Sequence, residues 1–104
     1  MAGFVSGSPG LSEIDSGLPR GKRYQIACKT WFTATGSPRP LSFKFEGDDG
    51  TLQTVNNLTV KYSEDKNYSG IPSKEYGCEA VIGGLKREFR LIFYCGECLW
   101  VMVI

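Results

Sequence analysis

The sequence predicts an all-β protein, a small antiparallel meander of about five or six strands that forms a curled sheet or a small barrel. Apolar residues recur at every second position from Tyr24 to Ile104, which is the period of a half-buried strand. Clusters of Gly, Pro, Asp and Asn separate these runs, as turns between strands require. No segment shows the helical spacing of apolar residues, and a chain of 104 residues fits a single domain.

We expect the β domain to span residues 22–104, preceded by a flexible arm over residues 1–21. The arm holds five Gly, four Ser and two Pro, a composition typical of flexible segments. It lacks the apolar core of a secretory signal, and no stretch of the chain approaches the roughly 18 apolar residues of a membrane span. The sequence therefore predicts a soluble, cytoplasmic protein that has no membrane partner.

The first half of the domain predicts three strands. Residues 22–33 alternate apolar and polar side chains and predict the first strand. Residues 36–40 predict a loop, because their prolines have no amide hydrogen to give to a ladder. The second strand, residues 41–46, leads into the hairpin turn 47–50, whose Gly and Asp residues tolerate positive φ. The third strand covers residues 51–62, with a bulge or short turn where two Asn residues break the alternation.

The second half predicts a long loop followed by a meander. Residues 63–73 are polar and contain Gly and Pro, which predicts the loop. Residues 76–82 and 89–93 form a hairpin around the glycine pair 83–84. After a second turn, residues 98–104 form the last strand.

This last strand is apolar on both faces. Leu99, Val101 and Val103 lie on one face and Trp100, Met102 and Ile104 on the other. An apolar edge strand exposed to water promotes aggregation, so we expect either the arm or a second copy of the chain to cover it. The predicted interface of a homo-oligomer consists of Ile92, Tyr94, Trp100, Met102 and Ile104.

Cys95 and Cys98 are candidate metal ligands, because two thiolates three residues apart at a turn can share one tetrahedral zinc ion. A closed site needs four ligands, and in a chain without histidine the others would be Cys28 and Cys78. Both lie in the buried series of their predicted strands, where free cysteine behaves as a small apolar residue. A zinc site, a disulfide and structural thiols are the alternatives; the last is the interpretation we favour, so we expect no metal or other cofactor.

The absence of histidine removes the usual general base near neutral pH and the usual partner of a nucleophile. Glu46, Asp48 and Asp49 cluster at a predicted hairpin tip, where carboxylates serve as turn residues. The glycine pair 83–84 lacks the strand-to-helix context of a phosphate-binding loop. We therefore expect no catalytic residues and a protein that is not an enzyme.

Charge is distributed unevenly along the chain, although the net charge is only +1. Basic residues dominate residues 16–45 and acidic residues dominate residues 46–81. Cations beside an exposed aromatic ring can bind single-stranded nucleic acid on a small barrel. The candidate face for this consists of Arg23, Lys29, Trp31 and Lys44.

Three segments carry a resemblance to a known group of proteins: Arg39–Glu46 with the turn after it, Tyr76–Cys78, and the ending Cys98–Trp100. They resemble a set of short uncharacterised all-β proteins of Firmicutes, over about residues 22–104. The resemblance implies a bacterial cytoplasmic protein, and it brings no known activity, catalytic residue or cofactor.

Taken together, these patterns predict a non-enzymatic protein-interaction module that self-associates through its C-terminal strand. The alternative is a small barrel that binds single-stranded nucleic acid through a basic and aromatic face.

Overall fold

The computed structural model describes residues 21–104, except for the side chain of Tyr68; the predicted arm, apart from Gly21, lies outside the described residues. This part contains the following strands: β1 (Arg23–Phe32), β2 (Pro38–Glu46), β3 (Leu52–Val55), β4 (Thr59–Tyr68), β5 (Ile71–Ile82), β6 (Leu85–Tyr94) and β7 (Leu99–Val103). It has no helix, and hence none that could cross a lipid bilayer. The predicted all-β class is confirmed, with seven strands in place of five or six.

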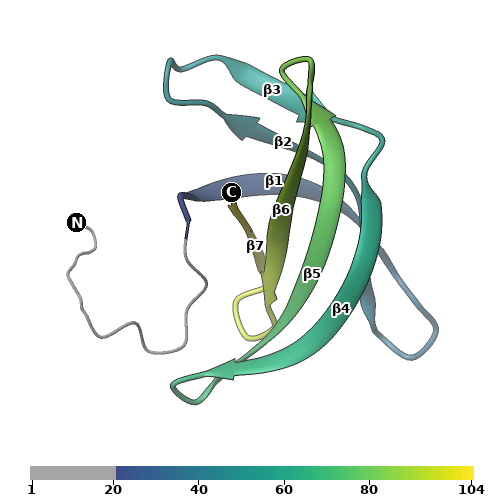
Figure 1. Cartoon of the computed structure of the whole chain (residues 1–104). Helices are drawn as coiled ribbons and strands as arrows, with labels where there is room; N and C mark the ends of the chain where they lie inside the picture. Colours follow the sequence, from purple (N-terminus) through teal and green to yellow (C-terminus); the bar gives the residue numbers. More distant parts are fainter. Residues whose placement is uncertain (1–20) are drawn as a thin grey trace.

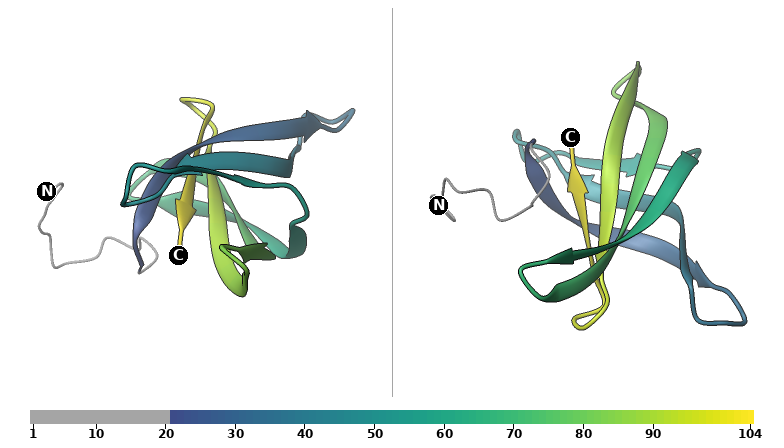
Figure 2. Two further views of the ribbon diagram at one scale, coloured as in Figure 1. Left: turned by 90° about the horizontal axis from the view of Figure 1, so that it is seen from above. Right: turned by 60° about the horizontal axis from the view of Figure 1, so that its bottom comes forward.

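All seven strands belong to one antiparallel sheet in the order β3-β2-β1-β7-β6-β5-β4 (Figure 1). The first and last strands of the domain pair with each other, which leaves β3 and β4 as the two edges. The sheet curls into a half-barrel, and the two views of Figure 2 show the open side between those edges. The fold is thus a meander whose ends meet in the middle of the sheet.

The predicted loop 63–73 is wrong, since β4 and β5 run through most of it and turn only at Ser69–Gly70. Residues 51–62, predicted as a single third strand, form β3 and the beginning of β4, which are separated at residues 56–58. The physical reason is the position of β4 at the edge of the sheet. An edge strand tolerates the charged residues that protect it from pairing with other chains, so it looks like a loop in the sequence.

The concave face of the half-barrel holds the main core. Its aromatic rings pack edge to face or tilted, with ring centroids of Phe43 and Phe89 5.6 Å apart and those of Phe93 and Trp100 5.0 Å apart. The core also buries aliphatic side chains of β5, β6 and β7, and Leu91 and Met102 are fully enclosed. Removing such side chains from water is the main stabilising contribution to a fold of this size.

A second, smaller apolar cluster lies on the opposite, convex face. The register pairs Ile92 with Val101 and Arg90 with Val103, so the small cluster consists of Ile92, Val101 and Val103, with Tyr94 packed against it. The Tyr94 hydroxyl accepts a hydrogen bond from Arg23 on β1, on the far side of β7. Val101 and Val103 on the convex face of β7 are therefore buried beneath side chains of this chain, whereas Leu99 on the same face is exposed.

Candidate functional site

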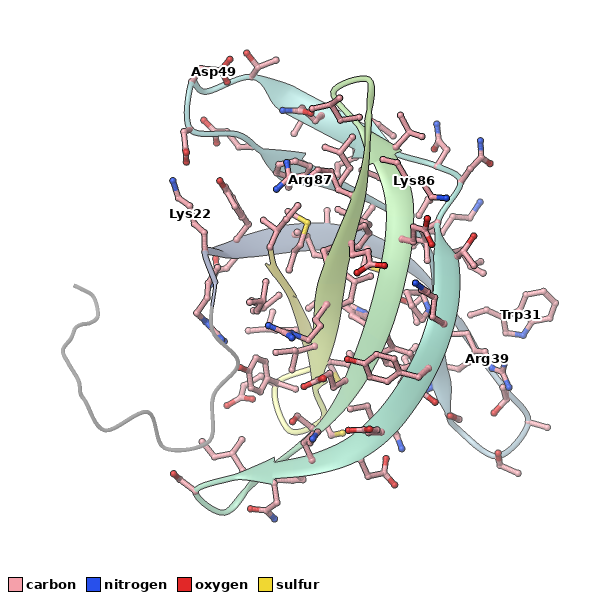
Figure 3. All side chains as sticks on the ribbon, viewed as in Figure 1. Lys22, Trp31, Arg39, Asp49, Lys86 and Arg87 are labelled. Carbon is pink, nitrogen blue, oxygen red and sulfur yellow. The ribbon has the colours of Figure 1, made fainter. Side chains whose placement is uncertain are left out.

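The clearest surface feature is a cationic face on the convex side of β1 and β2, made of Lys29, Trp31, Arg39 and Lys44. The register places Trp31 beside Arg39, Lys29 beside Ser42, and Ala27 beside Lys44. Figure 3 shows Trp31 and Arg39 projecting outward together, away from the sheet. Trp31 is 65% exposed, and the three cationic side chains are exposed as well.

Strand alternation explains why an indole ring stands in water. Phe32, the next residue, points to the concave side and packs edge to face on Phe93, at 6.1 Å between ring centroids. Since neighbouring residues of a strand face opposite sides, Trp31 must face outward. Among the side chains that the structure describes, no ring or cation stacks on the Trp31 indole. The indole of Trp31 is therefore largely open to solvent and available to a ligand.

A bulge sets the neighbour of Trp31. The register between β1 and β2 shifts after Lys29, where Leu41 is the extra residue on β2. A bulge moves every later side chain of its strand by one position relative to the partner strand. The shift brings Arg39 opposite Trp31, whereas the sequence placed Arg39 in a loop. Arg39 belongs to the basic stretch of residues 16–45, so its charge was visible in the sequence. No pattern in the sequence predicted the bulge that places it beside Trp31.

The electrostatics of the cationic face differ from those of the rest of the molecule. Ion pairs join Lys61 with Glu88 at 2.9 Å, Lys66 with Glu64 at 2.9 Å and Lys86 with Glu79 at 2.6 Å, all on β4, β5 and β6. Among the described residues, none of the three cations of the cationic face forms an ion pair. The one acidic residue of β1 and β2 is Glu46, at the opposite end of β2 from Arg39. Within the described part of the chain, no ion pair therefore neutralises the three cations of this face, and its nearest acid in the sequence is Glu46, two residues from Lys44.

Arg23, the remaining cation of the predicted nucleic-acid face, does not join the cationic face. It lies at the start of β1, beside Val103 of β7, and donates a hydrogen bond to the Tyr94 hydroxyl. Trp31 is at the other end of the same strand. The structure therefore brings together three of the four residues predicted for nucleic-acid binding, and it replaces Arg23 with Arg39.

A groove of about 490 Å³ lies next to Arg39, between the start of β2 and the middle of β4. Tyr76 forms part of its wall and is 5% exposed, and its hydroxyl donates a hydrogen bond to the carbonyl oxygen of Pro38. Burial raises the pKa of the Tyr76 hydroxyl to about 12. This hydroxyl therefore stays protonated at neutral pH and works as a donor that holds β5 against β2.

The five residues predicted for a homo-oligomer interface lie on two faces of the sheet. Trp100 is 6% exposed and Met102 is 0% exposed, both within the concave core, and Ile104 packs against that core. Ile92 and Tyr94 belong to the small convex cluster. Alternation fixes the faces within one strand, but the pairing of β6 with β7 decides which of their residues share a face. The premise that Trp100 and Met102 need a neighbouring subunit to cover them is therefore wrong.

The four cysteines are free and do not gather into one metal site. Cys78 is buried and Cys28 is half-buried, and burial raises the pKa of both thiols, for Cys78 to about 12. Both are therefore protonated at neutral pH. Cys95 and Cys98 are exposed on the turn between β6 and β7. No three Cys, Asp or Glu side chains come together as a metal-binding group anywhere in residues 21–104.

Of the acidic cluster predicted at the tip of the β2–β3 hairpin, Asp48 and Asp49 lie in the turn, whereas Glu46 is the last residue of β2 and pairs with Leu52. The Asp49 carboxylate accepts a hydrogen bond from the Thr51 amide at 2.9 Å, and this bond lowers the pKa of Asp49. Asp48 forms an ion pair with Lys22, which lowers the pKa of Asp48. The cluster thus closes the hairpin and ties it to the start of β1.

No protein-family model, curated protein or solved structure matches this chain. Its function is therefore inferred from the geometry and the charges of the chain itself.

Proposed function

We propose that this protein is a binding module for single-stranded nucleic acid and that the cationic face is its binding surface. The observation that carries the proposal is the exposed indole of Trp31, with Arg39 directly beside it and two further cations on the same face, none of the three in an ion pair among the described residues. Every base has an aromatic face that can stack on such a ring, and each stack is worth roughly 1–3 kcal/mol. Lys29, Arg39 and Lys44 would bind the phosphates on either side.

The modest net charge of +1 limits what the whole molecule contributes to binding. Four of the eleven acids of this chain, Glu64, Asp65, Glu79 and Glu88, are held in ion pairs on β4, β5 and β6, so their repulsion of a phosphate chain on β1 and β2 is weakened. Binding would then depend on three local cations and one ring. We expect an affinity that is weak and steeply dependent on salt.

Contact with another protein chain is the second candidate function, and a separate groove favours it. This groove, of about 360 Å³, is lined mainly by apolar side chains, and two of them are large and exposed, Ile71 at 48% and Leu99 at 54%. Exposed apolar patches of this kind mark protein contacts in many soluble proteins. The measurement that decides is the copy number in native mass spectrometry: a dimer that Leu99→Lys converts to monomer supports this function, and a wild-type monomer contradicts it.

The test of nucleic-acid binding is fluorescence anisotropy with a labelled oligothymidylate of about ten nucleotides. We expect Trp31→Ala to weaken binding by roughly fivefold to a hundredfold, the loss of one base stack. Three phosphate contacts give a slope of about −2 for the logarithm of the association constant against the logarithm of the salt concentration.

The matched control is Leu85→Ala, because Leu85 is equally exposed at 65% but lies on β6, outside the cationic face. This variant should bind as the wild type does. Equal binding by Trp31→Ala and the wild type would contradict the proposal, as would an absence of binding by the wild type at low salt.

A further inference from the structure

The groove beside Arg39 exists because β3 is too short to cover β2. β3 pairs only with Phe43–Glu46, so the first half of β2 has β1 on one side and no strand on the other. β4, the far edge of the sheet, forms the opposite wall with Val60 and Ser63. The groove of about 490 Å³ lies within the size range of small-ligand sites.

The chemistry of its β2 wall excludes a peptide strand as the occupant. Pro38 and Pro40 line this wall and have no N–H, so this edge cannot donate to a ladder. The carbonyl oxygen of Pro38 is already bonded to the Tyr76 hydroxyl. The groove offers the exposed apolar side chains of Leu41 and Val60, the edges of the buried prolines and Tyr76, and the hydroxyls of Ser37 and Ser63. Such a lining suits a flat ligand with a few polar groups, as a nucleobase is.

The charges around the groove leave one cation for a ligand. The two acids of its lining are compensated, Glu64 by Lys66 at 2.9 Å and Asp65 by Lys74. Arg39 lines the same groove and has no ion pair among the described residues. Its planar guanidinium can form two parallel hydrogen bonds to a phosphate.

Arg39 also connects the groove to the cationic face, because it is the cross-strand neighbour of Trp31. Opposed residues of antiparallel strands have Cα atoms about 4.5–5.5 Å apart. A phosphate held by Arg39 would thus lie next to a base stacked on Trp31 and at the rim of the groove.

We propose that the groove between β2 and β4 binds the nucleotide adjacent to the one stacked on Trp31, with the phosphate between the two held by Arg39. This inference rests on the proposed function and adds a second base site to it. The bound strand bends from the convex face of β1 and β2 over Arg39 and places one base in the groove, against Leu41 and Val60.

The test fills the groove without touching the cationic face. Ser63→Trp places an indole in the groove from an exposed position of β4, and Thr59→Trp, on the same strand but outside the groove, is the matched control. The probe is the same labelled oligothymidylate, with oligouridylate in parallel to distinguish DNA from RNA. We expect Ser63→Trp to weaken binding of at least one probe by about tenfold, the loss of one stacked base, and Thr59→Trp to bind as the wild type does.

The possible failures are distinguishable. If the wild type binds neither probe, the proposed function fails and the groove inference fails with it. If wild type and Ser63→Trp bind equally well, the cationic face binds nucleic acid but the groove does not, and only the inference is overturned.

A measurement on the wild type covers the case in which Ser63→Trp does not fold. Adding the oligonucleotide should shift the backbone amide NMR signals of Ser63 and Asp65, on the β4 wall. Unchanged signals at both residues, with Trp31 responding, would overturn the inference.

Discussion

The two halves of this half-barrel use charge in different ways. On β4, β5 and β6, lysines and carboxylates alternate and pair with each other, as Lys61 does with Glu79 and Glu88. On β1 and β2, the cations of the cationic face have no such partners, and an exposed tryptophan stands among them. Surface ion pairs contribute little to the stability of a fold, whereas cations without ion pairs beside an aromatic ring can bind a ligand. The comparison separates residues that serve the fold from residues available for function.

The largest expected effect comes from Met102→Lys on the last strand. The Met102 side chain is fully enclosed in the concave core, so the substitution buries an unpaired ammonium group. We expect a loss of more than about 4 kcal/mol, a large part of the stability of a small domain. The measurement is circular dichroism with urea unfolding, in which the variant should be mostly unfolded.

Leu99→Lys is the matched control on the same strand, because Leu99 is exposed. It should fold with nearly wild-type stability. A folded, soluble Met102→Lys monomer would show that Met102 lies at a subunit interface and would contradict the structure.

The next effect comes from Gly77→Ala in the paired half of the sheet. The Tyr62 ring lies directly on Gly77, where a Cβ would collide with it, and the Tyr62 hydroxyl donates to the Glu75 carboxylate at 3.0 Å. Overpacking of this kind costs about 1–3 kcal/mol. Thermal unfolding should show a lower melting temperature, by about 4–8 °C for each kcal/mol.

Gly96→Ala is the control for this substitution, since a Cβ at Gly96 meets no atom within 4 Å. Gly77→Ala should leave the binding of oligonucleotide by the folded protein unchanged, because Gly77 lies against Tyr62 and lines neither the cationic face nor the groove between β2 and β4. If Gly77→Ala weakened oligonucleotide binding without lowering the melting temperature, Gly77 would belong to the binding surface. The proposed division of the sheet into a binding half and a structural half would then be contradicted.

Much of the fold follows from alternation in the sequence. The concave residues of β1, β5 and β6, such as Ile26, Cys78 and Leu91, stand at the positions expected of a buried face. The hairpin around Gly83–Gly84 is confirmed, with Ile82 paired to Leu85. These features are local, so a single stretch of sequence contains the information for them.

The rest depends on pairing between strands. The sequence could not show that Ile92 shares a face with Val101, because the register between β6 and β7 is a property of two segments together. The same limit hid the bulge that brings Arg39 beside Trp31. Pro38 and Pro40 predicted a loop, yet proline is compatible with a strand whose outer edge is unpaired.

The smallest expected effect is a loss of stability in alkaline solution. Burial raises the pKa of the Cys78 thiol from 9.0 and of the Tyr76 hydroxyl from 10.0, each to about 12. The unfolded chain therefore loses these protons at lower pH than the folded chain does. Their contribution to stability is fully present below about pH 9 and is lost as the pH rises toward 12.

Urea midpoints measured between neutral and alkaline pH check this expectation. Cys78→Ala lowers the midpoint at neutral pH, because it leaves a cavity, but should decline less steeply with pH than the wild type. Parallel declines of the two proteins would show that Cys78 does not titrate differently in the folded and unfolded states. Trp31 and its neighbouring cations lie outside this core, so Trp31→Ala should follow the wild-type decline.

The most direct test uses the two tryptophans of the chain, of which Trp31 is exposed and Trp100 is buried in the core. Each gives one indole N–H signal in a proton–nitrogen NMR spectrum, and Trp31→Phe assigns them. On addition of the oligonucleotide we expect the Trp31 signal to shift progressively while the Trp100 signal stays in place. A spectrum in which neither signal moves, or in which only the Trp100 signal moves, would contradict the proposal that the cationic face binds nucleic acid.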